Sequence, residues 1–149
     1  MKRFATPVRR LEIVTYWVIE DPDGIYDFIN NEIRREWEAD AKSEGRNPQD
    51  DPWLKTLSKR KWSLEIVPIT RIKLNPAIMN YVDSKSGYNF SKNLAKRSRE
   101  LQTEIQEFST PIWPVIVRRE DFMLVDGYCR YATLKAIGVS KTYAYIGTT

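Results

Sequence analysis

The stretch LVDGYCRYATLKAIGV, residues 124–139, constrains the fold of this chain more than any other. Apolar residues up to Asp126 are typical of a strand, and Gly127 permits a tight turn. Apolar residues then recur at helical spacing until Gly138, a residue type that ends helices. A β-rich run, KTYAYIG (141–147), follows. The pattern predicts strand, turn, helix and strand, so we expect a mixed α and β fold.

The first 62 residues predict one strand and two helices. LEIVTYWVI (11–19) is β-branched and aromatic and indicates a strand. Asp21 before Pro22 is a helix-start signal, and Gly45 is placed to end that helix. We expect a polar loop over 46–51, with Asp51 capping a short helix that begins at Pro52.

The middle of the chain continues the mixture. LEIVPITRIKLNP (64–76) indicates a strand interrupted by Pro68, and residues 77–90 indicate a loop with one helical turn. We expect a helix from Ser91, as its N-cap, followed by a hairpin formed by 111–119 and 122–125.

Histidine is absent and Cys129 is the sole cysteine. A Ser-His or Cys-His triad is therefore impossible, and a structural zinc site is close to excluded. No apolar run reaches the length of a membrane span and no signal-peptide pattern opens the chain, so we expect a cytoplasmic protein. The net charge of +4 permits phosphate-rich partners without requiring them.

Two groups of residues are suited to binding phosphate. The backbone N–H groups after Gly127 face outward at a positive helix end, and Arg130 can reach the same anion. Lys96, Arg99 and Thr103 share one face of the preceding helix. The alternatives are a plain turn with Arg130 in solvent, and a solvated basic face. Asp126 can hold magnesium or act as a base, or can simply cap its own helix.

Three blocks resemble the ParB/sulfiredoxin superfamily, over residues 64–147. LEIVPITRIKLNP is similar to the family's opening strand. RELQTEIQEF followed by PIWPVIVRR is similar to its helix and Pro-hydrophobic strand, and LVDGYCRYATLKAIGV is similar to its phosphate loop. The resemblance implies an α+β fold with a compact mixed sheet at 63–149, preceded by an αβ extension at 1–62 that packs on it.

The resemblance also implies a nucleotide site. It assigns the phosphates to Gly127, Tyr128, Cys129 and Arg130, with Lys96, Arg99, Thr103 and Lys73 completing the site. Asp126, from its position beside this loop, and Arg130 are the candidate catalytic residues. ATP or ADP, with Mg²⁺, is the ligand that we expect.

The chain departs from each branch of the superfamily. Sulfiredoxins have Gly-Cys-His-Arg, so Tyr128 stands at the position of the reactive cysteine and Cys129 at that of the histidine. The free serine kinase branch has Asp-Gly-x-His-Arg, and that histidine is also missing. ParB proteins have a second loop arginine and a following helix-turn-helix domain, and we expect neither in this chain.

The residues and the resemblance lead to three expected functions. The first expectation is phosphoryl hydrolysis or transfer by an ATPase or DNase that acts on DNA. The second is an ATP- or ADP-dependent kinase of a small metabolite such as free serine. The third is a non-catalytic regulator that binds nucleotide or DNA.

Overall fold

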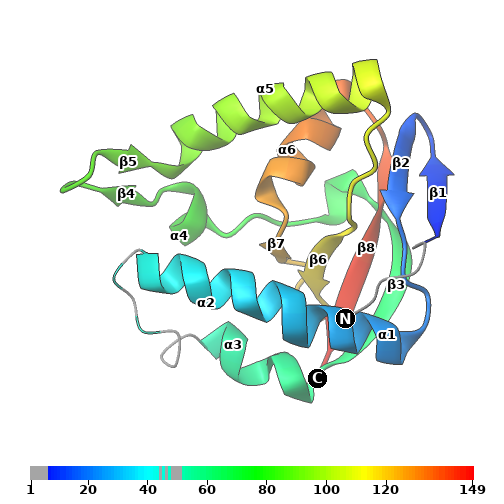
Figure 1. Cartoon of the computed structure of the whole chain (residues 1–149), viewed down its shortest axis with the longest axis horizontal. Helices are drawn as coiled ribbons and strands as arrows, with labels where there is room; N and C mark the ends of the chain where they lie inside the picture. The colour runs from blue at the N-terminus through cyan, green and yellow to red at the C-terminus, as the bar shows by residue number, and fades with distance from the viewer. Residues whose placement is uncertain (1–6, 44, 46, 48–51) are drawn as a thin grey trace.

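The computed structural model describes residues 7–43, 45, 47 and 52–149. Most of the polar loop expected at 46–51, and the Asp51 cap, lie outside the described residues. Figure 1 shows a central sheet with helices on both sides.

The central sheet has four strands in the order β3 (Lys61–Pro68), β8 (Lys141–Thr148), β6 (Val115–Arg118) and β7 (Leu124–Asp126). The β3–β8 and β6–β7 pairs are antiparallel, and the β6–β8 pair at the centre is parallel. This mixed sheet confirms the α+β fold class.

Two helices cover one face of the sheet, α5 (Phe90–Phe108) and α6 (Tyr128–Ile137). Side chains from β6, β7 and β8 alternate between the two faces, as strand geometry requires. Those toward α5 and α6 join a cluster that includes Val115, Val117, Leu124, Leu134, Ala144 and Ile146. The start of α6 therefore lies directly at the end of β7.

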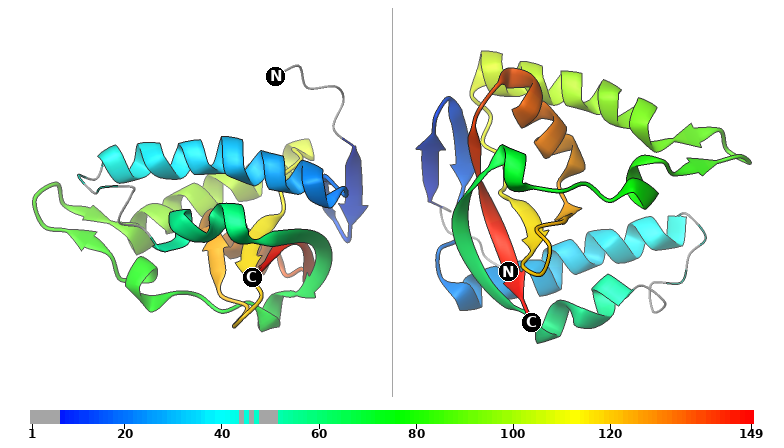
Figure 2. Two further views of the ribbon diagram at one scale, coloured as in Figure 1. Left: turned by 90° about the horizontal axis from the view of Figure 1, so that it is seen from below. Right: turned by 180° about the vertical axis from the view of Figure 1, so that it is seen from behind.

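The N-terminal segment packs on the sheet and forms no isolated unit. It comprises β1 (Val8–Leu11), β2 (Val14–Trp17), α1 (Pro22–Phe28), a π-helical segment η1 (Ile29–Ile33), α2 (Arg34–Ser43), α3 (Pro52–Thr56) and the 3₁₀ turn η3 (Leu57–Lys59). Its apolar side chains form a second cluster with the sheet: Ile25, Phe28, Ile29, Ile33, Leu54, Leu57, Trp62, Ile116, Val125 and Tyr145. The views from below and behind show α1 and α2 running along the molecule on this side (Figure 2).

Between β3 and α5 the chain forms small elements. A 3₁₀ turn, η4 (Ile69–Arg71), leads to α4 (Pro76–Met79), and β4 (Val82–Asp83) pairs with β5 (Tyr88–Asn89). This hairpin projects from the body of the molecule and runs directly into α5 (Figure 1).

Several local predictions are confirmed. The Asp21 carboxylate accepts from the backbone N–H of Gly24, with Pro22 at the first position of α1. Pro68 ends β3, and Gly138 ends α6 with a φ of 82°. These signals depend on neighbouring residues alone, which explains why they could be identified from sequence.

Two predictions about element boundaries are wrong. The strand expected over 11–19 is a hairpin, because the chain turns at Glu12, whose φ is 56°. Asn89, and not Ser91, caps α5 by accepting from the N–H of Lys92. The Ser91 hydroxyl donates instead to the carbonyl of Met79, a contact made possible only by the folded hairpin.

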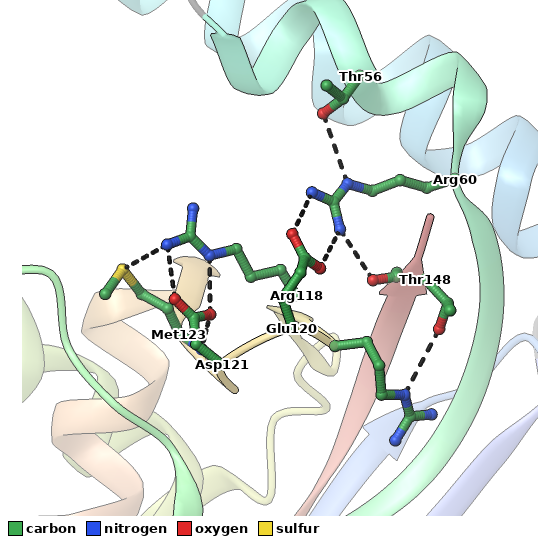
Figure 3. Close-up of polar contacts among 9 residues, drawn as sticks. Thr56, Arg60, Arg118, Glu120, Asp121, Met123 and Thr148 are labelled. Carbon is green, nitrogen blue, oxygen red and sulfur yellow. Dashed lines mark hydrogen bonds and ion pairs between the residues drawn. The ribbon is translucent and has the colours of Figure 1, made fainter.

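A buried arginine ties the N-terminal segment to the sheet. Arg60 is only 6% exposed and donates to both carboxylate oxygens of Glu120, at 2.8 and 2.9 Å, and to the carbonyl of Gly147 (Figure 3). Trp62 is 3% exposed and packs so closely on Gly147 that a Cβ there would lie 2.7 Å from its ring. Arg60 and Trp62 are therefore core residues.

None of the helices in the described part of the chain is long and apolar enough to cross a membrane.

Candidate functional site

The loop between β7 and α6 presents free backbone donors. Gly127 has a φ of 101° and is the N-cap of α6, with no side chain capping it among the described residues. The N–H of Tyr131 donates to the Gly127 carbonyl at 2.8 Å. The N–H groups of Tyr128, Cys129 and Arg130 have no acceptor in the described structure. Together with the helix dipole they form a site suited to an anion.

Asp126 is held by two side chains and does not cap α6. Its Oδ2 accepts from Arg130 Nη2 at 3.0 Å, and its Oδ1 accepts from Trp37 Nε1 at 3.2 Å. Trp37 comes from α2, so the N-terminal segment reaches the loop directly. The carboxylate is only about a quarter exposed, which makes this three-residue contact a well-defined part of the site.

Arg130 folds back over the loop. Its Nη2 and Nε lie 2.8 and 3.0 Å from where a Cβ on Gly127 would stand, and its Nη1 donates to the carbonyl of Trp113 at 3.3 Å. The Trp113 ring stacks on Phe28 with a centroid distance of 4.4 Å. Arg130 is therefore held beside the loop by Asp126 and Trp113, where sequence reasoning placed it on the anion itself or in solvent.

Glu36, from α2, brings a second carboxyl to the loop. Partial burial raises its pKa, the neighbouring Asp126 carboxylate raises it further, and Arg130 lowers it. The two acidic groups therefore interact across α2 and the loop. A carboxyl that takes up a proton more readily than usual is suited to proton transfer.

Tyr128 contributes its backbone alone to the outer surface of the loop. Its side chain is buried, with the hydroxyl donating to the carbonyl of Leu124 at 2.9 Å and accepting from the N–H of Asn75 at 3.0 Å. Burial raises the pKa of this hydroxyl. The side chain links the loop to the segment after η4, so it is structural.

Cys129 is a weak candidate for a nucleophile. Partial burial raises the pKa of its thiol, against the lowering effects of Arg97 and of a hydrogen bond with Thr133. A raised pKa leaves less of the reactive thiolate at neutral pH.

The face of α5 that carries Lys96, Arg99 and Thr103 does not meet the loop. The residues of α5 buried against the core are Leu94, Ser98 and Ile105. Lys96, Arg99 and Thr103 lie on the opposite side of the helix, and all three are exposed. The structure therefore separates them from Gly127 and Arg130.

Arg97 is the cation of α5 that lies near the loop. Its charge acts on the Cys129 thiol, and its position beside the buried face follows from its spacing to Leu94 and Leu101. The backbone of Lys73 bridges to Met123, just before β7, and its side chain is exposed. No contact joins Lys73 to the β7–α6 loop within the described residues.

An apolar cavity of about 330 Å³ adjoins the loop on the side of Tyr128. It lies between α4, α5 and α6 and is lined by Leu74, Met79, Leu94, Tyr128, Tyr131, Ala132, Lys135 and Ala136. A flat apolar group next to a phosphate site has room here.

Two other acidic residues have structural partners. Asp83 accepts from the N–H of Lys85 and the hydroxyl of Ser86 in the β4–β5 turn. Asp121 accepts two hydrogen bonds from Arg118, at 2.8 and 2.7 Å (Figure 3). Within the described residues, no group of three or more His, Cys, Asp or Glu side chains could hold a metal ion by itself.

Asp121→Asn should reduce the sensitivity of the protein to acid. The Arg118 guanidinium lowers the pKa of Asp121 from 3.8 to about 2. The stabilisation is therefore complete above the unfolded value of 3.8 and is lost as the pH falls toward about 2. Urea unfolding at a series of acid pH values should show that the free energy of unfolding falls less with decreasing pH in the variant than in the wild type. The control Asp27→Asn makes the same change of charge at an exposed position and should lose as much stability in acid as the wild type. Equal losses of stability in all three proteins would contradict the role given to the Asp121–Arg118 pair.

Sequence reasoning missed three residues of the site: Glu36, Trp37 and Arg97. Trp37 fitted the apolar spacing of its helix. A packed tryptophan also needs a hydrogen-bond acceptor for its N–H, and this need was the sequence signal that Trp37 would contact a polar group. Arg97 could have been found from its position next to the apolar face of its helix. Nothing in the sequence indicates Glu36.

No family model matches this sequence, and no curated protein matches it. Solved structures do resemble it. Two structures of a pNOB8-like ParB N-domain match 60% of this chain, with 21% and 20% identity and a TM-score of 0.43. The chain is similar in fold to ParB N-domains. The matches span only 30% and 29% of those ParB chains.

Sulfiredoxin from Arabidopsis thaliana matches 57% of this chain and 86% of its own, with 18% identity and a TM-score of 0.40. Identities this low concern the fold alone, so function has to be argued from the residues of the loop.

Proposed function

We propose that this protein binds a nucleotide by its phosphates at the β7–α6 loop and hydrolyses or transfers a phosphoryl group. The observation that carries the proposal is the set of three unpaired N–H groups after Gly127, at the positive end of a ten-residue helix. Arg97, which acts on the Cys129 thiol, and Arg130 add positive charge near these groups. Backbone donors and guanidinium groups together are a common way to bind phosphate.

ATP or ADP is the proposed ligand, with its base against the apolar cavity beside Tyr128. The cavity is large enough for a planar ring, and Lys135 at its rim adds a donor. Lys73, whose backbone pairs with Met123 before β7, is a further proposed contact for an outer phosphate.

Magnesium bound together with the phosphates fits the residues beside the loop. Magnesium in phosphoryl-transfer sites is usually held by one or two carboxylates and the substrate phosphates, and Asp126 and Glu36 are the two carboxylates that interact here. When bound, the ion would neutralise phosphate charge. The chain itself positions the phosphates through the loop N–H groups, and Glu36 can accept or release a proton.

Within this class we favour an ATPase or DNase that acts on DNA. The net charge of +4 and the exposed cations of α5 suit a polyanionic substrate. One observation favours a non-catalytic regulator as the second candidate. Both oxygens of Asp126 are engaged by Arg130 and Trp37, so nucleotide binding that pulls Arg130 away would release α2 without any turnover.

A thermal-shift screen across nucleotides, with and without Mg²⁺, tests the central claim. A ligand at about 100 times its Kd stabilises by about 2.7 kcal/mol. For a chain of 149 residues this raises Tm by roughly 5 to 10 °C. If no nucleotide raises Tm, the proposal fails.

Turnover then separates the activities. Phosphate release stimulated by DNA, or metal-dependent nicking of a supercoiled plasmid, supports the favoured function. Nucleotide consumption only after a small acceptor such as serine is added supports a kinase instead. Binding without turnover supports the regulator.

A further inference from the structure

The first half of α5 carries a group of cations without carboxylate partners. Residues 90–99 contain Lys92, Lys96, Arg97 and Arg99 and no acidic residue. Lys92, Lys96 and Arg99 lie on the exposed side of the helix, and none forms an ion pair within the described structure. We call these three residues the basic face of α5.

The charges along α5 run against the helix dipole. Acidic residues stabilise the first turns of a helix and basic residues its last turns, yet α5 has no acidic residue in its first turn and no basic residue in its last. Lys92 and Lys96 are also like charges one turn apart, which destabilises a helix. Helix stability therefore does not account for this arrangement, whereas an anionic partner would.

The spacing of the basic face fits a repeating anion. With a rise of 1.5 Å per residue, Lys92 and Arg99 are roughly 10 Å apart along one straight side of α5. The helix lies at the outside of the molecule, where nothing else of the described chain covers this side (Figure 1). Its small, exposed neighbour Ala95 lets phosphates approach.

The exposed side of α5 does not suit a membrane surface. Helices that lie on lipid combine cations with a continuous apolar face. The apolar face of α5 is buried against α6, and its one largely exposed apolar side chain, Phe108, stands at the far end beside Glu104 and Glu107. Nucleic acid is therefore favoured over lipid.

We propose that the basic face of α5, through Lys92, Lys96 and Arg99, binds the phosphate backbone of double-stranded DNA. This inference deepens the proposed action on DNA and does not depend on nucleotide binding at the loop. Because the face and the loop lie on opposite sides of α5, both ligands can be bound at once. The basic face contacts phosphates and reads no base sequence.

Fluorescence anisotropy with a labelled short duplex, at a series of salt concentrations, tests the proposal. Each phosphate contact contributes about 0.9 to the slope of log K against log salt. The triple variant Lys92→Gln, Lys96→Gln and Arg99→Gln should therefore bind more weakly, with a slope shallower by roughly 3. Its Tm should not fall, because repulsion along the helix is relieved.

The matched control is Lys42→Gln, Lys59→Gln and Lys141→Gln. These lysines are exposed, are spread over α2, η3 and β8, and change the net charge by the same amount. The control should keep most of the wild-type slope. An equal loss in both triple variants would show a general charge effect and would overturn the proposal, as would failure of the wild type to bind the duplex.

Two further measurements identify the partner and separate the two proposals. Polyglutamate that competes as well as unlabelled duplex, or binding to phosphatidylserine vesicles in preference to duplex, would overturn the assignment to DNA. The thermal shift with nucleotide should be unchanged in the α5 triple variant. Loss of that shift together with duplex binding would contradict the separation of the two sites.

Discussion

Arg130→Ala should abolish stabilisation by nucleotide and should also lower the stability of the free protein. The substitution removes a guanidinium from the loop, the ion pair with Asp126 and the hydrogen bond to Trp113. Breaking a fully buried ion pair costs about 3 to 5 kcal/mol, and because both side chains retain some exposure we expect about 1 to 3 kcal/mol. Urea unfolding and the nucleotide thermal shift measure the two effects.

Two variants separate binding from stability. Cys129→Ser changes the neighbouring side chain but leaves the loop N–H groups and Arg130 in place, so its thermal shift should match that of the wild type. Adding Asp126→Ala to Arg130→Ala removes the carboxylate left without its cation and should recover part of the lost stability, with no recovery of binding. A normal thermal shift in Arg130→Ala would exclude the arginine from the site.

Gly127→Ala should have an effect of similar size through the backbone. A φ of 101° is strained for any residue with a Cβ, at a cost of about 1 to 2 kcal/mol. The added Cβ would lie 2.8 Å from Arg130 Nη2 and 3.0 Å from the buried Val115. Arg130 must therefore move, and we expect loss of nucleotide stabilisation together with a lower urea midpoint.

Gly87→Ala is the matched control for strain. Gly87 has a φ of 75° in the β4–β5 turn, and a Cβ there would meet no atom within 4 Å. It should lose stability through strain alone and should retain the nucleotide thermal shift. If the two glycine variants lose equal stability and both still bind nucleotide, the close contact of Gly127 with Arg130 has no role in nucleotide binding.

The loop joins two parts of the chain that the sequence treats as separate. Asp126 and Arg130 lie within residues 64–147, whose motifs resemble the ParB/sulfiredoxin superfamily. Glu36 and Trp37 come from the N-terminal segment. The expectation that residues 1–62 pack on the rest is consistent with the second apolar cluster. The structure adds that this segment supplies polar groups to the candidate site.

The sequence by itself determined the features that depend on near neighbours. The Asp21–Pro22 helix start, the end of β3 at Pro68 and the β7–loop–α6 unit closed by Gly138 were all predicted correctly. Each rests on a hydrogen bond or a φ value set within a few residues. The N–H donors of the loop belong to the same group, because the first turn of a helix leaves them free wherever it occurs.

Only the tertiary structure decided which side chains meet at the loop. Helical spacing grouped Lys96, Arg99 and Thr103 on one face, but the packing of Leu94 and Ser98 against α6 turns that face to solvent and brings Arg97 to the loop instead. The partners of Asp126 were likewise unpredictable, since Trp37 lies 89 residues away in sequence. The apolar spacing of α5 indicates which face is buried, but which distant residues that face meets is set by packing of the whole core, and local sequence patterns carry no information about such contacts.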